Sequence, residues 1–368
     1  MEIPLPKLIA FEITRTCPLK CKHCRGDSRN HSYPDELTFD EIKRILDNVA
    51  SFSKPIIILT GGEPLTRPDV FDIASYSTSL GMRTVLATCG RLLDDDTARK
   101  LIDSGIQRIS ISIDGADAEK HDSFRGDPGA FDAAMKGIEI ARKNGLDFQI
   151  NSTLTTLNID ELEELHDLAV SLGAVGFHPF LLVPMGRGQG LADFALSPEK
   201  YEASLERIVE IASQSPIEIK PTCSPHYSRV YRQKKMSPAE GAAPTGSHAG
   251  HPGPGGHPGP GGHRSVMTRG CLGGQGFGFI SHVGKVQMCG FLEIEAGDLR
   301  KESYDFNKIW DESKLFNDVR TKERYIGKCG VCEFWKVCGG CRARAFYQNG
   351  DYLEEEPNCI YVPRTAST

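Results

Sequence analysis

The stretch TCPLKCKHCRG, residues 16–26, places Cys17, Cys21 and Cys24 in a C-x3-C-x2-C spacing directly after the apolar run of residues 8–13. Iron–sulfur clusters prefer soft thiolate ligands, and a four-iron cluster normally takes four of them. Three cysteines therefore predict a cluster that keeps one iron open for another ligand. The alternative is a structural zinc knuckle with His23 as fourth ligand, although His23 lies between two cysteines in a span too short for the usual zinc spacing.

Composition limits the classes of protein to which the chain can belong. Its 368 residues suffice for one large and one smaller domain, and its net charge of −6 marks no nucleic-acid surface. No apolar run reaches the roughly 20 residues of a membrane span, and no signal peptide is visible. We therefore expect a cytoplasmic protein with no membrane or nucleic-acid partner. Twelve cysteines in such a protein favour metal or cluster ligation over disulfides.

Apolar strands and amphipathic helices alternate along the first part of the chain. Thr38 and Glu41 predict a capping box at the start of the first helix. Alternation of this kind builds parallel α/β architecture, in which the chemistry gathers at the C-terminal ends of the strands. Strands are predicted over residues 8–13, 55–59, 83–87, 108–113, 147–153 and 176–182, and helices from about residues 94 and 130 and over 159–171 and 197–213.

Two unusual segments follow the predicted α/β region. Residues 237–263 are rich in Gly, Pro, Ala and His, a composition that buries too little apolar surface to offset the entropy of ordering. We predict a tether, with metal or heme binding by its histidines as the alternative. Two β-rich runs around Val283-Gly284 then predict a hairpin with Cys271 and Cys289 at its ends.

A dense cysteine array ends the chain. Its members are Cys329, Cys332, Cys338 and Cys341, in the spacing C-x2-C-x5-C-x2-C, and Cys359 beyond them. A pair of zinc ribbons is the alternative to clusters, but the C-x5-C spacing and the isolated last cysteine fit ribbons poorly. The array therefore predicts iron–sulfur ligation.

The N-terminal cysteines, followed about forty residues later by the motif TGGEP at residues 60–64, resemble the radical S-adenosylmethionine (SAM) superfamily. The C-terminal cysteines are similar to those of members with a SPASM or Twitch auxiliary-cluster domain, and the chain most resembles the heme b synthase family among them. The resemblance implies a partial (β/α)6 TIM-like barrel over residues 1–215. A linker would span residues 216–267, and a SPASM/Twitch domain residues 268–368.

The resemblance also implies how SAM is bound, with the open iron holding its amino and carboxylate groups. Glu63 would hold the SAM amine, and glycines beside it permit close approach. Ser112 would contact SAM, although it could instead only cap the loop that follows its strand. Cys89 is expected to line the wall of the site. The implied SAM contacts are Gly61, Gly62, Glu63, Ser112, Arg125, Asn151 and Val183.

SPASM topology assigns one complete four-iron cluster to Cys329, Cys332, Cys338 and Cys359. The inner set of Cys271, Cys289 and Cys341 departs from the fuller pattern because no cysteine lies between its first two members. The inner cluster is therefore absent, takes a non-cysteine ligand or keeps an open iron, so the expected cofactors are SAM, the radical SAM [4Fe–4S] cluster and one or two auxiliary [4Fe–4S] clusters. Cys223 and His226 could supply a missing ligand, with an ordinary packed loop as the alternative.

The implied reaction is oxidative decarboxylation of two propionates of iron-coproporphyrin III to vinyl groups, giving heme b. The expected partners are the iron-porphyrin and a flavodoxin- or ferredoxin-like electron donor, and an external acceptor stays open. Candidate substrate contacts are Arg187, whose guanidinium matches a carboxylate, and His226. Arg342 and Arg344 are further candidates for carboxylate binding, with surface ion pairs as the alternative.

Two other functions remain open from the sequence. A SPASM peptide or protein maturase would use the same cofactors, although no leader-binding module is visible at the N-terminus. A non-enzymatic iron–sulfur electron-transfer protein would use the same clusters but would leave the TGGEP motif unexplained.

Overall fold

Most of the strands run parallel in one curved sheet. The computed structural model describes residues 3–236 and 270–364, so the predicted tether lies outside the described residues. The described strands form a single sheet in the order β10-β9-β8-β1-β2-β3-β4-β5-β6-β7. The six predicted strands are confirmed as β1 (Leu8–Thr14), β2 (Ile56–Gly61), β3 (Thr84–Thr88), β4 (Arg108–Ser112), β5 (Asp147–Leu154) and β6 (Gly176–Leu181).

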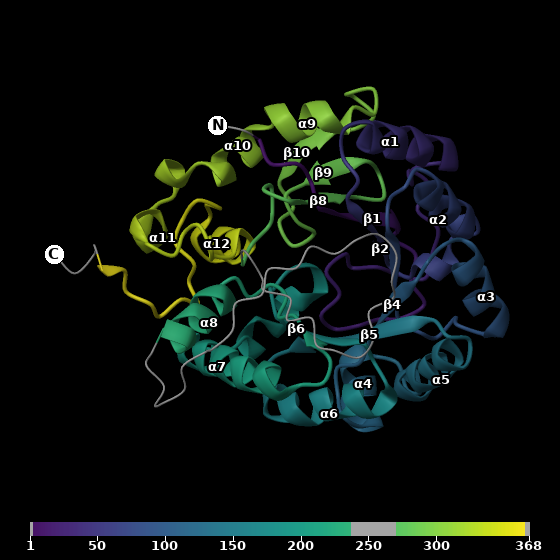
Figure 1. Ribbon diagram of the computed structural model, residues 1–368, viewed down its shortest axis with the longest axis horizontal. Helices are drawn as coiled ribbons and strands as arrows, with labels where there is room; N and C mark the ends of the chain where they lie inside the picture. Colours follow the sequence, from purple (N-terminus) through teal and green to yellow (C-terminus); the bar gives the residue numbers. More distant parts are fainter. Residues whose placement is uncertain (1–2, 237–269, 365–368) are drawn as a thin grey trace, which may run out of the picture.

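Strand residues alternate between a fully buried face and a half-buried one. In β5, Phe148 and Ile150 are buried, whereas Gln149 and Asn151 are half-buried. Successive strand side chains point to opposite faces, and the helices surround the outside of the sheet (Figure 1). The polar residues of β5 therefore face the inside of the partial barrel.

Helices follow the strands as the parallel architecture requires. The predicted capping box is confirmed, since Glu41 N donates to Thr38 Oγ1 at 3.3 Å and Thr38 N to Glu41 Oε2 at 2.8 Å. No helix was predicted at α4 (Ala118–Arg125), whose buried residues include His121 and Arg125, because this polar face gives no apolar period. The helices are α1 (Phe39–Phe52), α2 (Val70–Ser79), α3 (Asp95–Asp103), α4 (Ala118–Arg125), α5 (Ala130–Lys143), α6 (Leu162–Leu172), α7 (Pro198–Gln214) and α8 (Tyr227–Met236), with the short 3-10 helices η1 (Pro64–Thr66), η2 (Ile159–Glu161) and η3 (Gly186–Phe194).

The C-terminal segment extends the same sheet. Strand β8 (Phe277–Ile280) pairs in parallel with β1 and antiparallel with β9 (Lys285–Gln287), which confirms the predicted hairpin. Strand β10 (Glu295–Asp298) lies at that edge and β7 (Glu218–Ile219) at the other. The remaining helices are α9 (Phe306–Glu312), α10 (Lys314–Arg320), η4 (Lys322–Arg324), α11 (Gly327–Val331) and α12 (Arg342–Asn349). None of the helices in the described ranges combines the length and hydropathy that a bilayer crossing requires.

Candidate metal centres

The three N-terminal cysteines pack together in the loop after β1. Cys17 and Cys21 are buried in one small cluster with Leu19, and Cys24 and Cys89 pack against this cluster. Ser28 N donates to Cys24 Sγ at 3.3 Å, and Arg125 Nη1 donates to Cys21 Sγ at 3.6 Å. Burial raises the pKa of Cys17 to about 12. A thiol with a raised pKa loses its proton when its sulfur binds a cation, and the irons of a cluster are such cations.

Gly61 and Gly62 bring the end of β2 against this cysteine loop. Gly62 N donates to Thr14 O and Glu63 N to Thr16 O, both at 2.8 Å. A Cβ on Gly62 would lie 2.4 Å from Thr16 O, and one on Gly61 2.2 Å from Thr14 O. The glycines are therefore required for packing within the protein itself, a role that the sequence analysis missed.

Glu63 is fully buried and its carboxylate is held by three donors. Cys89 N donates to it at 2.7 Å, Thr88 Oγ1 at 2.9 Å and Leu65 N at 3.1 Å. Burial raises the pKa of Glu63. A carboxylate desolvated and fixed in this way is suited to an ammonium partner, and the contact with the SAM amine stays a prediction.

The other residues predicted to contact SAM come from neighbouring elements. Ser112 on β4 lies opposite Asn151 on β5 in the parallel register. Arg125, on α4, pairs with the buried Asp114 at 2.6 Å and also reaches Cys21, whereas Val183 is buried in the main core. The structure thus brings Arg125 to the cysteine loop and places Ser112 beside Asn151 on the sheet.

Arg187, predicted to contact substrate, makes its hydrogen bonds to the cysteine loop. Its Nε donates to Cys21 O at 2.9 Å, and its Nη1 donates to Asp27 Oδ1 at 2.8 Å and Ser28 O at 2.7 Å. Such contacts hold the loop in place. Contact with a substrate carboxylate stays a prediction.

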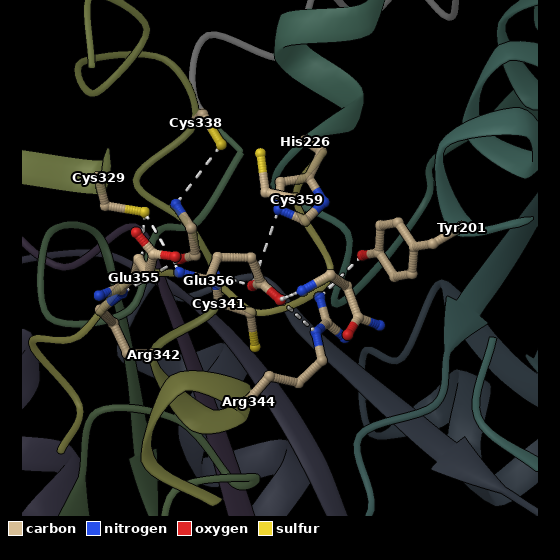
Figure 2. Close-up of polar contacts among 12 residues, drawn as sticks. Tyr201, His226, Cys329, Cys338, Cys341, Arg342, Arg344, Glu355, Glu356 and Cys359 are labelled. Atoms are coloured by element: carbon tan, nitrogen blue, oxygen red, sulfur yellow. Dashed lines mark hydrogen bonds and ion pairs between the residues drawn. The ribbon is translucent and has the colours of Figure 1, made fainter. Parts of the chain in front are cut away.

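The outer auxiliary set of cysteines lines one cavity with His226 and Arg229, and Figure 2 shows most of its members. Backbone amides donate to three of its sulfurs, from Glu356 to Cys329 at 3.4 Å, from Phe334 to Cys332 at 3.4 Å and from Gly340 to Cys338 at 3.5 Å. Hydrogen bonds to cluster sulfurs help to set reduction potential. The structure therefore brings together the four residues assigned to one cluster, Cys329, Cys332, Cys338 and Cys359.

The inner auxiliary set also converges. Cys271 N donates to Cys338 O at 3.1 Å, which places Cys271 beside the turn that leads to Cys341, and a Cβ on Gly273 would lie 2.9 Å from the side chain of Met288, which precedes Cys289. Cys338 and Cys341 are assigned to different sets, and the glycines between them have φ of 77° and 63°, a left-handed backbone that favours glycine. The turn between these two cysteines therefore depends on its glycine pair.

A buried carboxylate that the sequence analysis missed connects the two auxiliary sets (Figure 2). Glu356 Oε2 accepts from Cys341 N at 2.5 Å and Oε1 from Arg344 Nε at 2.9 Å, while Glu356 N donates to Cys329 Sγ. Burial alone would raise the pKa of Glu356, but Arg344 and His226 hold it below its usual range. Arg342 and Arg344 are buried, so the surface-pair alternative is wrong for both.

The zinc alternatives gain no support from the arrangement of donors. Across residues 3–236 and 270–364, no group of three or more His, Cys, Asp or Glu side chains is placed to hold a metal ion. A zinc ion would need its sulfurs about 2.3 Å from one point. His23 instead stacks on Phe124, with ring centroids 4.6 Å apart, and its Nε2 lies 3.7 Å from Asp114.

Comparisons with known proteins identify the family. The radical SAM superfamily matches residues 11–169, which include the cysteine loop and the TGGEP motif. The AdoMet-dependent heme synthase of Methanosarcina barkeri is 49% identical over 97% of both chains, and that of Nitratidesulfovibrio vulgaris is 45% identical over 98% of this chain and 94% of its own. This chain belongs to the radical SAM superfamily, in the family of the AdoMet-dependent heme synthases.

The fold agrees with that of a solved radical SAM relative. Streptococcus suis SuiB bound to S-adenosylmethionine is 17% identical, with a TM-score of 0.70 over 99% of this chain and 77% of SuiB. At this identity the likeness concerns the fold alone, and it confirms the partial barrel. Membership of the superfamily implies a radical SAM enzyme that uses SAM and a four-iron cluster. The three adjacent buried thiols of the cysteine loop, with their amide and guanidinium donors, fit such a cluster.

Proposed function

We propose that this radical SAM enzyme converts two propionates of iron-coproporphyrin III to vinyl groups and so forms heme b. The main support is the 49% identity with the Methanosarcina barkeri AdoMet-dependent heme synthase over 97% of each chain. A second relative from that organism, 28% identical over 96% of this chain, is named Fe-coproporphyrin III synthase. A porphyrin substrate and an external electron donor follow from this proposal.

The residues of the barrel have distinct roles in this proposal. Cys17, Cys21 and Cys24 would hold the cluster that, with SAM, supplies a 5′-deoxyadenosyl radical. Arg187 fixes the cysteine loop through Cys21 O, Asp27 and Ser28 O. Glu63, desolvated at the end of β2, would receive the SAM amine.

The electron balance gives the C-terminal cysteines a role. Loss of a hydrogen atom from the β-carbon of a propionate leaves a carbon radical, and loss of CO2 then forms the vinyl group and releases one electron. The auxiliary thiols would hold [4Fe–4S] clusters, whose chemistry at this place would be to accept that electron. Two propionates require two SAM molecules.

Anaerobic turnover with SAM, reductant and iron-coproporphyrin III tests the proposal. We expect heme b by mass spectrometry, with two 5′-deoxyadenosines formed for each porphyrin. A Cys332→Ala, Cys338→Ala protein should still cleave SAM but form little vinyl product, which raises the ratio of 5′-deoxyadenosine to product. If the parent forms no vinyl product, the substrate assignment is wrong. If the ratio is unchanged although the iron is lost, the outer cluster does not accept the electron.

A further inference from the structure

Cys223 lies beside the inner auxiliary set, on a segment that the SPASM cysteine pattern does not include. A Cβ on Gly270 would lie 2.2 Å from Pro225 O, so the backbone just before Cys271 packs directly on the turn that contains Cys223. On the other side of Cys271, a Cβ on Gly273 would lie 2.9 Å from the side chain of Met288. Cys271 is therefore held between the turn of Cys223 and the end of β9 that precedes Cys289.

Arg344 connects the turn of Cys223 to the helix that starts at Cys341. Its Nη2 donates to Cys223 O at 2.7 Å, and Tyr201 Oη donates to the same oxygen at 3.1 Å. Arg344 follows Cys341 by three residues, so the two lie on one side of the first turn of α12. This contact links the backbone of Cys223 to the helix that begins next to Cys341.

Two further properties distinguish Cys223 from an ordinary packed cysteine. Its φ of 56° is a left-handed conformation that non-glycine residues rarely adopt, and such strain concentrates at functional sites. Cys271 N donates to Cys338 O at 3.1 Å, so Cys271 lies beside the short turn between Cys338 and Cys341, the same region that Arg344 links to Cys223 O. His226, the other candidate ligand, instead lines the cavity of the outer set.

We propose that Cys223 is the fourth protein ligand of the inner auxiliary cluster, so that Cys223, Cys271, Cys289 and Cys341 hold one [4Fe–4S] cluster. The inference rests on the auxiliary clusters of the proposed function. Ligation exchanges the S–H bond for an S–Fe bond and releases the proton to solvent, with no oxidation. Four thiolates leave no open iron, so the inner cluster serves electron transfer and does not bind the porphyrin.

The test uses full-length protein with Cys17, Cys21 and Cys24 replaced by alanine, so that only auxiliary iron is counted. This background should hold about eight irons per chain and should give no three-iron signal in electron paramagnetic resonance after mild oxidation with ferricyanide. Adding Cys223→Ala should leave one iron without a protein ligand, so that oxidation removes it and produces about one three-iron cluster per chain. Cys89→Ala, a thiol outside both sets, and Tyr201→Phe, which loosens the turn but keeps the thiol, are the matched controls and should behave as the background.

Three outcomes would overturn the inference: a three-iron signal in the background itself, an unchanged signal in Cys223→Ala, or the same signal in Tyr201→Phe. If the background protein holds no auxiliary iron, the auxiliary clusters of the proposed function are wrong as well. If porphyrin turnover fails, by contrast, the iron count of the variants still tests the role of Cys223.

Iodoacetamide labelling of the parent provides a second measurement that needs no variant. Cys223 should be protected as strongly as Cys271 while the clusters are loaded, and should react after chelation. Equal labelling of Cys223 before and after chelation would contradict the assignment.

Discussion

Replacing Glu356 with alanine removes the carboxylate that lies between the two auxiliary sets. Its oxygens accept from Cys341 N and Arg344 Nε, and the side chains of Glu356 and Arg344 are 0% and 4% exposed. The variant would leave a buried guanidinium without its carboxylate and a buried amide without its acceptor. Neither group can recover its hydrogen bonds from bulk water at this depth.

The expected loss of stability follows from this burial. Breaking a buried ion pair by removal of one partner costs about 3–5 kcal/mol. Glu355→Ala is the matched control, because this neighbouring side chain is 39% exposed, its pair with Lys328 Nζ spans 3.7 Å, and the one backbone amide that donates to it, Lys328 N at 2.8 Å, lies where water can replace the carboxylate, which predicts a loss of about 1 kcal/mol. Glu356→Gln keeps an acceptor for Cys341 N but loses the charge, so its cost should lie between the two.

The assay is anaerobic urea unfolding of the reconstituted protein, followed by circular dichroism, with iron content measured for each variant. Glu356→Ala should move the unfolding midpoint well below that of Glu355→Ala and should lose auxiliary iron during reconstitution. Equal midpoints for these two alanine variants, at equal iron content, would refute the structural role given to Glu356.

Three further predictions concern the barrel and its first helix. Replacing Cys17, Cys21 and Cys24 together with alanine should abolish 5′-deoxyadenosine formation under dithionite and leave the C-terminal iron in place; continued SAM cleavage would contradict the assignment. Gly62→Ala should lose N-terminal iron because its Cβ would lie 2.4 Å from Thr16 O, whereas Gly190→Ala, with nothing within 4 Å, should retain it; equal iron in both would be the contrary result. A hydrogen bond from Arg300 lowers the pKa of Glu41 from 4.5 to about 2, so the ionised Glu41 contributes fully to stability above about pH 4.5 and loses this contribution as the pH falls toward 2. The difference in unfolding free energy between the parent and Glu41→Gln should therefore shrink from pH 4.5 to pH 2. A difference that stays constant over this range would contradict the prediction.

Local signals in the sequence were sufficient to predict most of the strands and helices of the barrel. Continuous apolar runs such as Ile56–Leu59 identify buried parallel strands, and the capping box at Thr38 identifies the start of α1. The parallel pairing of β8 with β1 was not predicted, because strands far apart in the chain contain no local signal for their partner. The barrel sheet therefore continues into the C-terminal segment, beyond the six strands that local patterns identified.

The sequence predicted the cysteines of the candidate sites but not the buried carboxylate between them. Cysteines could be identified directly, since their side chains are themselves the ligands that clusters prefer. Glu356 could not be identified, because in sequence it is one of three consecutive acidic residues, Glu354 to Glu356, of which only Glu356 is fully buried. Its role depends on Arg344 and Cys341, whose proximity only the folded chain determines.

Contacts between the two cysteine regions suggest why they share one sheet. Arg25, next to Cys24, donates to Gly290 O at 3.2 Å, next to Cys289, and to Glu12 Oε1 at 2.7 Å. The buried Glu12 on β1 also lies 2.9 Å from His282 Nδ1 in the hairpin after β8. Burial would raise the pKa of Glu12, but Arg25 and His282 hold it well below its usual range, so the carboxylate stays charged and the three elements stay joined. A fixed separation between the site of radical formation and the proposed electron acceptor follows from this buried connection, and an electron released in the barrel would not need a domain movement to reach the inner thiols.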